Sequence, residues 1–183
     1  MKLHGPTLFE GILGEACSRA MMAQSDPMNQ EYTVLLILTD GIINDMGATI
    51  DSLVTASRLP LSVIIVGVGD AAFDQMEALD SDEGLLRDSR GNMASRDIVQ
   101  FVPYRQMTDG ARLAKAVLAE VPGQVVDYYK SIGIEPNPAV REEDRSVNPS
   151  YYTVYAPCIH LHYHIYTCVH VHPPYVCIHH IYT

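Results

Sequence analysis

Two long apolar runs constrain the fold of this chain more than any other feature. Residues 32–39 read YTVLLILT and end at an Asp-Gly pair, and residues 61–69 read LSVIIVGVG. Neither run alternates apolar with polar residues, which is typical of parallel strands covered on both faces. A third run, IVQFVPY at 98–104, predicts another strand, and its proline indicates a strand end or a sheet edge.

Helical patterns separate these strands. Apolar residues recur every four positions from Leu8 to Ala20, and Thr7 and Glu10 have the spacing of a capping box, which predicts Thr7 as the N-cap. The predicted helices are 7–24, 49–59, 71–79 and 109–129, the last kinked or split by Pro122, with a loop or hairpin at 80–96. This order predicts an α/β fold with a mostly parallel sheet and helices on both faces.

The composition changes abruptly near residue 150. Residues 151–183 contain no Asp, Glu, Lys or Arg, yet they hold seven of the eight histidines and three of the four cysteines. The segment before them is rich in proline and charge, which is typical of a linker. We therefore predict a domain at 1–139, a linker at 140–150 and a low-complexity tail at 151–183.

The tail uses a narrow alphabet of Ile, His, Tyr, Thr, Cys and Val, which alternating purine–pyrimidine repeats encode. This indicates translated repeat or intronic DNA, so we expect the tail to stay apart from the domain and to carry no function. Deletion after Val147 should then leave the thermal midpoint unchanged or higher. One alternative is a zinc site, although Cys158, Cys168 and Cys177 match no usual spacing. Another is adhesive β-structure, because apolar residues alternate there.

The charge of the chain disfavours several classes of function. Its 12 basic residues against 22 acidic ones give a net charge of −10, which repels nucleic-acid phosphates and provides no basic patch for an anionic membrane. The sequence shows no apolar stretch of about 18 residues and no signal peptide, so we expect an intracellular chain. Cys17 falls in a helical pattern and is interpreted as a buried thiol.

Thr39-Asp40-Gly41 after a strand is, taken alone, an ordinary turn. Its context is more specific. The stretches YTVLLILTDGIINDM, RDIVQFVPYR and VLAEVPGQVVDYY resemble the A domain of copines, and the resemblance covers about residues 3–136. It implies a von Willebrand A-like, doubly wound and mostly parallel sheet, incomplete here because the family's first strand is missing.

The resemblance also implies a metal site at the carboxyl ends of the strands, where open α/β sheets bind ligands. In the family, an Asp-x-Ser/Thr-x-Ser/Asn run, a threonine and an aspartate hold Mg²⁺ or Ca²⁺. Thr7 and Asp40 match the last two, and the first run does not occur before Met1. Such cations prefer oxygen ligands, and two are too few, so we expect no site tighter than about millimolar.

Simpler interpretations exist for each of these residues. Thr7 could serve only as a helix cap, and Asp40 only as a turn residue. Asp80, Asp82 and Glu83 have the residue types of a cation cluster, but a solvated acidic loop is the interpretation we favour.

By this resemblance the chain is a fragment of a copine-like, calcium-dependent phospholipid-binding protein, cytoplasmic and peripheral at the plasma membrane. Its A domain would bind partner proteins and would not be an enzyme. Phospholipid binding would belong to C2 domains absent from this chain. One alternative is the A domain of a copine-like RING ubiquitin ligase lacking its RING, which requires paired Cys/His zinc ligands. The other is a non-functional truncated product.

Overall fold

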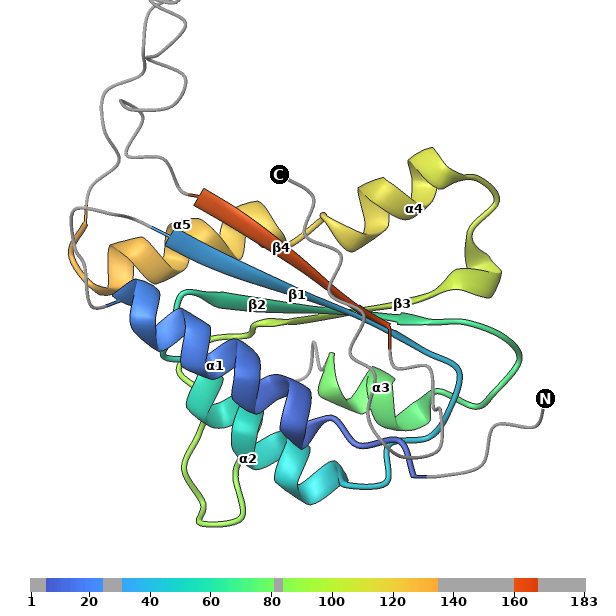
Figure 1. The fold of residues 1–183 in the computed structure, drawn as a ribbon, viewed down its shortest axis with the longest axis horizontal. Helices are drawn as coiled ribbons and strands as arrows, with labels where there is room; N and C mark the ends of the chain where they lie inside the picture. Colours follow the sequence, from blue (N-terminus) through green and yellow to red (C-terminus); the bar gives the residue numbers. More distant parts are fainter. Residues whose placement is uncertain (1–5, 25–30, 81–83, 135–159, 168–183) are drawn as a thin grey trace, which may run out of the picture.

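A central parallel sheet lies between two layers of helices (Figure 1). The computed structural model describes residues 6–24, 31–80, 84–134 and 160–167. The strands are β1 (Glu31–Thr39), β2 (Leu61–Gly67), β3 (Val99–Pro103) and β4 (His160–Thr167). Their order in the sheet is β3-β2-β1-β4, and every neighbouring pair is parallel. The predicted α/β class, consistent with a von Willebrand A-like fold, is confirmed.

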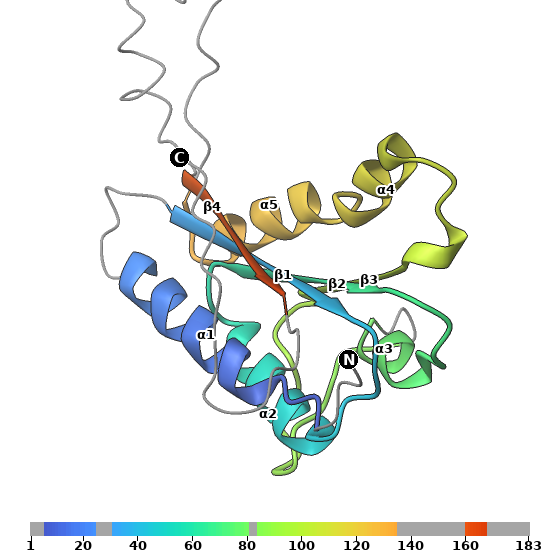
Figure 2. The same cartoon turned by 45° about the vertical axis from the view of Figure 1, so that its right-hand side comes forward.

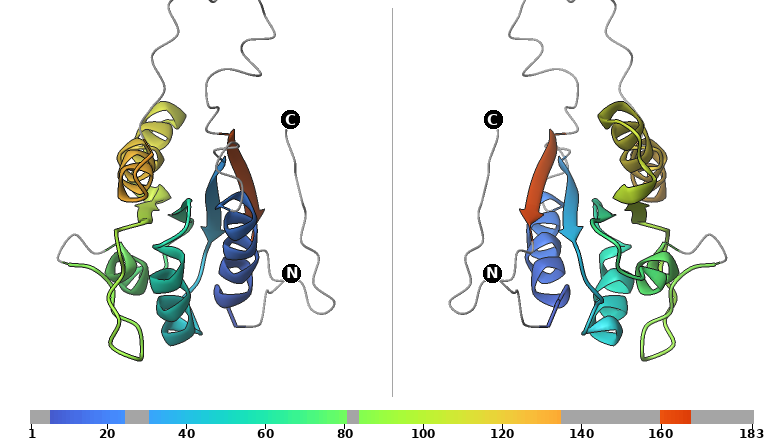
Figure 3. Two further views of the ribbon diagram at one scale, coloured as in Figure 1. Left: turned by 90° about the vertical axis from the view of Figure 1, so that its left-hand side faces the viewer. Right: turned by 90° about the vertical axis from the view of Figure 1, so that its right-hand side faces the viewer.

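The helices divide between the two faces of the sheet. They are α1 (Glu10–Gln24), α2 (Met46–Ala56), α3 (Asp74–Leu79), α4 (Gly110–Val117) and α5 (Val121–Ser131), with a 3₁₀ turn η1 at Tyr104–Gln106. Helices α1, α2 and α3 cover one face, and α4 and α5 lie over the other (Figures 2 and 3). A helical segment therefore follows each of the first three strands, which is how parallel neighbours are connected.

Successive residues of β1 enter two different cores. Leu35 and Ile37 pack against α1 and α2, whereas Tyr32 and Val34 pack against α5. Side chains alternate across a strand with a period of two, so both faces of β1 are buried. This explains why its sequence is continuously apolar.

The strand predictions of 32–39, 61–68 and 98–103 are confirmed to within one residue. The helix bounds differ by up to three residues, because helix ends are weakly specified by periodicity. The predicted 109–129 helix is split into α4 and α5, with Pro122 in the first turn of α5, where a proline costs no hydrogen bond. An antiparallel bridge between Arg87 and Met93 confirms the hairpin. Cys17 is a free, buried thiol whose pKa is raised by desolvation.

A hydrogen-bonded network runs through the α5 face. The Tyr32 hydroxyl lies 2.8 Å from Ser62 Oγ, which in turn donates to Gln124 Oε1. Burial raises the pKa of Tyr32, and it raises that of Tyr129 to about 12 with help from the neighbouring tyrosines and Glu31. These hydroxyls therefore stay protonated, and able to donate, up to strongly alkaline pH.

Arg96 closes this network at the amino end of the strands. Its Nη2 donates to the carbonyls of Leu59 and Leu61 at 2.6 and 2.8 Å. Its guanidinium carbon lies 5.7 Å from the ring centroid of Tyr32 and 5.5 Å from that of Tyr128, within cation–π range. One side chain thus ties the α2–β2 connection to the tyrosines of β1 and α5.

The tail joins the sheet, contrary to our expectation. Residues 160–167 form β4, which pairs with β1 from Glu31↔His160 to Leu38↔Thr167. The expectation that the tail stays apart is wrong for these eight residues. A strand edge presents a row of backbone donors and acceptors, which the alternating, β-prone segment satisfies without any charged side chain. The predicted linker at 140–150, and Cys158, Cys168 and Cys177, lie outside the described residues.

Candidate functional site

The carboxyl edge of the sheet brings together the segments of Thr7 and Asp40. Asp40 is exposed and directly follows the last residue of β1. Thr7 forms a parallel bridge with Ile43: its N–H donates to Asn44 Oδ1 at 2.6 Å, and its carbonyl accepts from the Asn44 N–H at 2.9 Å. A Cβ atom placed on Gly41 would lie only 3.1 Å from Thr7 Oγ1. The Thr7 hydroxyl therefore lies against the turn that follows Asp40.

Asp45 holds this arrangement in place. Its carboxylate accepts from the Phe9 N–H at 3.0 Å and the Glu10 N–H at 2.9 Å, which are free donors at the start of α1. It also accepts from Thr49 Oγ1 at 3.2 Å in the first turn of α2. A single carboxylate thus satisfies α1 and restrains α2, and its negative charge suits both helix N-termini.

The predicted capping role of Thr7 is wrong. Helix α1 begins at Glu10, and Thr7 lies three residues earlier, bridged to Ile43. The cap is supplied instead by Asp45, which lies beyond β1 in the sequence. A carboxylate is a stronger acceptor for the orphan N–H groups than a hydroxyl, so the long-range cap replaces the local one. Local spacing carries no signal for a cap from so distant a residue.

Exposed apolar side chains occur beside these segments in the sequence. Leu8, Ile42 and Val68 are 45%, 57% and 40% exposed, and they follow Thr7, Gly41 and the last residue of β2, respectively. The loop after β2 is fixed close by, because the Val68 N–H donates to the Thr39 carbonyl at 2.8 Å. Exposed apolar side chains mark a protein-binding surface when they form one contiguous patch.

As a cation site, this edge has suitable atoms in small number. The Thr7 hydroxyl and the Asp40 carboxylate are the hard oxygen donors that Mg²⁺ and Ca²⁺ prefer. Six or more oxygens are needed, so water or a partner would have to supply the rest. Their joint coordination of a metal remains a prediction.

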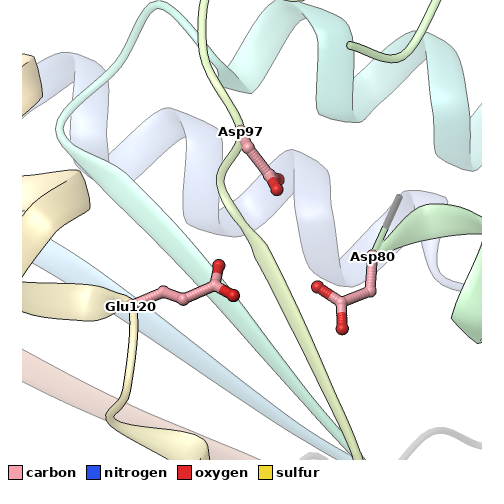
Figure 4. A group of neighbouring side chains, drawn as sticks. All are labelled: Asp80, Asp97 and Glu120. Atoms are coloured by element: carbon pink, nitrogen blue, oxygen red, sulfur yellow. The ribbon is translucent and has the colours of Figure 1, made fainter. Parts of the chain in front are cut away.

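A second group of acidic residues lies at the other ends of the strands, their amino ends (Figure 4). Asp80 follows α3, Asp97 precedes β3 and Glu120 precedes α5, and one carboxylate oxygen from each lies within 4.8 Å of the others. Asp97 accepts from the Val99 N–H at 3.0 Å, and Glu120 accepts from Gln124 Nε2 at 3.3 Å. Exposed acidic groups like Asp97 are common without a cation.

Asp80 lies near Asp82 and Glu83 in the sequence, but both of these residues lie outside the described part of the chain. The structure instead places Asp80 near Asp97 and Glu120, residues from distant parts of the chain. No motif signals this grouping, because it arises from how α3, β3 and α5 pack. The strands are parallel, so a residue before β3 lies at the amino edge, away from Asp40 after β1.

Comparison with known proteins finds sequences similar to the first 137 residues. The sequence model of the copine family, described as "Copine", matches residues 1–137. Copine-C of Dictyostelium discoideum is 53% identical over 135 residues, which cover 73% of this chain and 25% of that protein. The chain thus spans about a quarter of the length of this relative. Within the described residues, no helix has the length and apolar character required to cross a bilayer.

Proposed function

Because the chain belongs to the copine family, we propose that its domain is a binding module that contacts partner proteins through the carboxyl edge of the sheet. The observation that carries this proposal is the contact between the Thr7 segment and the turn after Asp40. The contact brings the Thr7 hydroxyl beside Gly41, the sequence neighbour of Asp40, and the exposed side chains of Leu8 and Ile42 follow these residues in the sequence.

In this proposal a divalent cation, Mg²⁺ or Ca²⁺, is held weakly by Thr7 and Asp40, and a carboxylate of the partner completes its coordination. Cations of this class bind six to eight oxygens, so a partner ligand raises affinity for metal and partner together. Leu8 and Ile42 would then pack against the partner around the ion. The module acts by binding rather than by catalysis.

The cellular setting is part of the same proposal. Calcium-dependent phospholipid binding is a general copine property, and we assign it to parts of the whole protein other than this domain. The module would then work in the cytoplasm and at the membrane periphery. The net charge of −10 supports this division, because an acidic domain repels anionic lipid unless a cation intervenes.

A cation titration followed by NMR tests the metal site. Adding Mg²⁺ or Ca²⁺ to the full chain should shift the amides of Thr7, Asp40 and Gly41, with half-saturation on the order of millimolar. Asp40→Asn should abolish these shifts. Asp97→Asn, at the opposite edge, is the matched control and should leave them intact. Shifts that survive Asp40→Asn, or that move with Asp97→Asn, contradict the proposed site.

A photo-crosslinking amino acid placed on the surface tests protein binding. When it replaces Ile42, it should form a discrete covalent adduct with a partner protein. This adduct should require a divalent cation and should be lost in the Asp40→Asn variant. The comparison position is Val126, 48% exposed on α5, where no cation-dependent adduct is expected. Equal adducts at the two positions, or indifference to chelation, would refute binding through this edge.

A further inference from the structure

Without β4 the outer strands of the sheet would be β3 and β1, and these two differ in how readily they can pair with another strand. The β3 edge is short, spans five residues and ends in Pro103, which cannot donate to a ladder. Strand β1 is nine residues long, contains no proline and has six apolar residues. Long apolar edges without proline accept additional strands unless they are covered. In this chain, β4 covers that edge.

The hold on β4 is limited to one neighbour. Among the described elements β4 packs extensively against β1 alone, whereas β1 is also gripped by β2 and α1. Figure 1 shows β4 at the margin of the sheet, with α1 beside β1. An element held by a single ladder is the easiest to detach, because opening it breaks few tertiary contacts.

The covalent connection permits β4 to reach elsewhere. Ile134 packs against the core that contains Tyr32, Tyr128 and Tyr129, and the Tyr129 hydroxyl donates to the Glu31 carbonyl. Strand β4 begins at His160, paired with that same Glu31. Ile134 and His160 therefore both lie at the amino end of β1. The 25 residues between them in the sequence could span at most about 80–90 Å when fully extended.

We propose that the outer edge of β1 is a strand-accepting site and that two copies of this chain exchange β4 across it. Each β4 then pairs with β1 of the other copy in the same parallel register, Glu31↔His160 to Leu38↔Thr167. The exchange is self-complementary and closes as a twofold dimer with no new type of contact. The tether gives a chain's own β4 a local concentration on the order of millimolar, so exchange rises as the chain approaches that concentration.

Single-cysteine crosslinking tests this exchange in the full chain. Cys17 is first replaced by alanine, and Cys158, Cys168 and Cys177 by serine. One population then carries Leu36→Cys and another Ile165→Cys, two positions paired in the ladder. Mixing at high concentration, then diluting and oxidising, should give a disulfide-linked dimer whose yield grows several-fold with the mixing concentration.

The controls make every outcome decisive. Leu161→Cys, four residues away along β4, should crosslink to Leu36→Cys at least tenfold less. A chain carrying both Leu36→Cys and Ile165→Cys should close its disulfide within the monomer at micromolar concentration. Tyr163→Pro/His164→Pro should remove the dimer, because the pair deletes backbone donors from β4, whereas His170→Pro/Val171→Pro should not. Equal crosslinking by Leu161→Cys, or no mixed dimer although the monomer disulfide closes, would overturn the proposal.

Discussion

The two faces of the sheet are packed by different chemistry. The face under α1, α2 and α3 is aliphatic and phenylalanine-rich, with Leu13, Leu35 and Phe73 almost fully buried. The α5 face buries tyrosines, Ser62 and Gln124, joined by hydrogen bonds and closed by Arg96. The stability of the first face therefore depends on how completely its apolar side chains fill the space between the helices and the sheet. The second depends on the hydrogen bonds that join its buried polar side chains.

The largest effect is expected on the aliphatic face. Leu35→Ala should lower the free energy of unfolding by about 2–5 kcal/mol, because it leaves a cavity at a fully buried position. Chemical denaturation measures this loss, which should not vary with pH. Leu118→Ala, at a position 42% exposed on the surface, should cost less than about 0.5 kcal/mol. Similar losses in the two variants would break the comparison.

An intermediate effect is expected for the polar network. Gln124→Met should lower the free energy of unfolding by about 1–3 kcal/mol, because it leaves the Ser62 hydroxyl without its acceptor. Gln100 faces the same side, but its buried Oε1 has no hydrogen-bond partner among the described residues. Gln100→Met should therefore be neutral or stabilising. If both methionine variants behave alike in denaturant, pairing is not what stabilises this face.

An alkaline titration should separate the two faces further. The pKa of Tyr129 is raised to about 12 in the folded state, first by burial. A raised folded pKa contributes stability that is present below the unfolded value, about 10, and lost as pH rises through 12. Partial contact with water reduces this loss to about 1–2 kcal/mol.

Tyr129→Phe should remove that share of the loss between pH 10 and 12. Tyr104→Phe, on a side chain 50% exposed, should leave the alkaline profile unchanged. Denaturation midpoints measured across this range decide between them. Parallel curves for Tyr129→Phe and the parent chain would contradict the assignment.

The smallest effect is expected at the margin of the aliphatic face, where Asp51 of α2 tethers the hairpin. The N–H and hydroxyl of Ser89 donate to its carboxylate at 2.7 Å, and they lower the pKa of Asp51. A lowered folded pKa contributes stability that is present above the unfolded value, near 3.9, and lost as pH falls through the folded one.

Hydrogen exchange at the Ser89 amide should therefore accelerate as pH falls below about 4, after correction for the intrinsic rate. Asp51→Asn should abolish this dependence. Asp127→Asn, on the exposed side of α5, should not alter it. If neither substitution changes the pH dependence of the exchange rate, the Asp51 carboxylate does not hold the hairpin.

The sequence predicts the layered fold because each of the first three strands can be recognised from its own local run of apolar residues. The runs at β1 and β2 are mostly apolar, since both of their faces are covered. The same runs and turns carry the copine resemblance, which placed Thr7 and Asp40 on one edge. The structure agrees as far as the bridge between Thr7 and Ile43.

What the sequence did not predict depends on residues that meet only after folding. Asp45, which follows β1 in the sequence, caps α1, the helix that precedes β1. Asp80, Asp97 and Glu120 come together from three separate parts of the chain. The pairing of β4 with β1 was not predicted, for a different reason. A segment with no charge and a repetitive alphabet has no register of its own, and only the open edge of β1 supplies one.

The cap at Asp45 also has a mechanical meaning. Helix α1 has 15 residues and is about 22 Å long. One end is fastened to Asp45 beside the turn of Asp40, and at the other end Gln24 Nε2 donates to the Tyr128 hydroxyl at 3.1 Å. The helix runs along the strands from one end of the sheet to the other. It therefore connects the turn after β1, through hydrogen bonds at its two ends, to a tyrosine that belongs to the opposite layer.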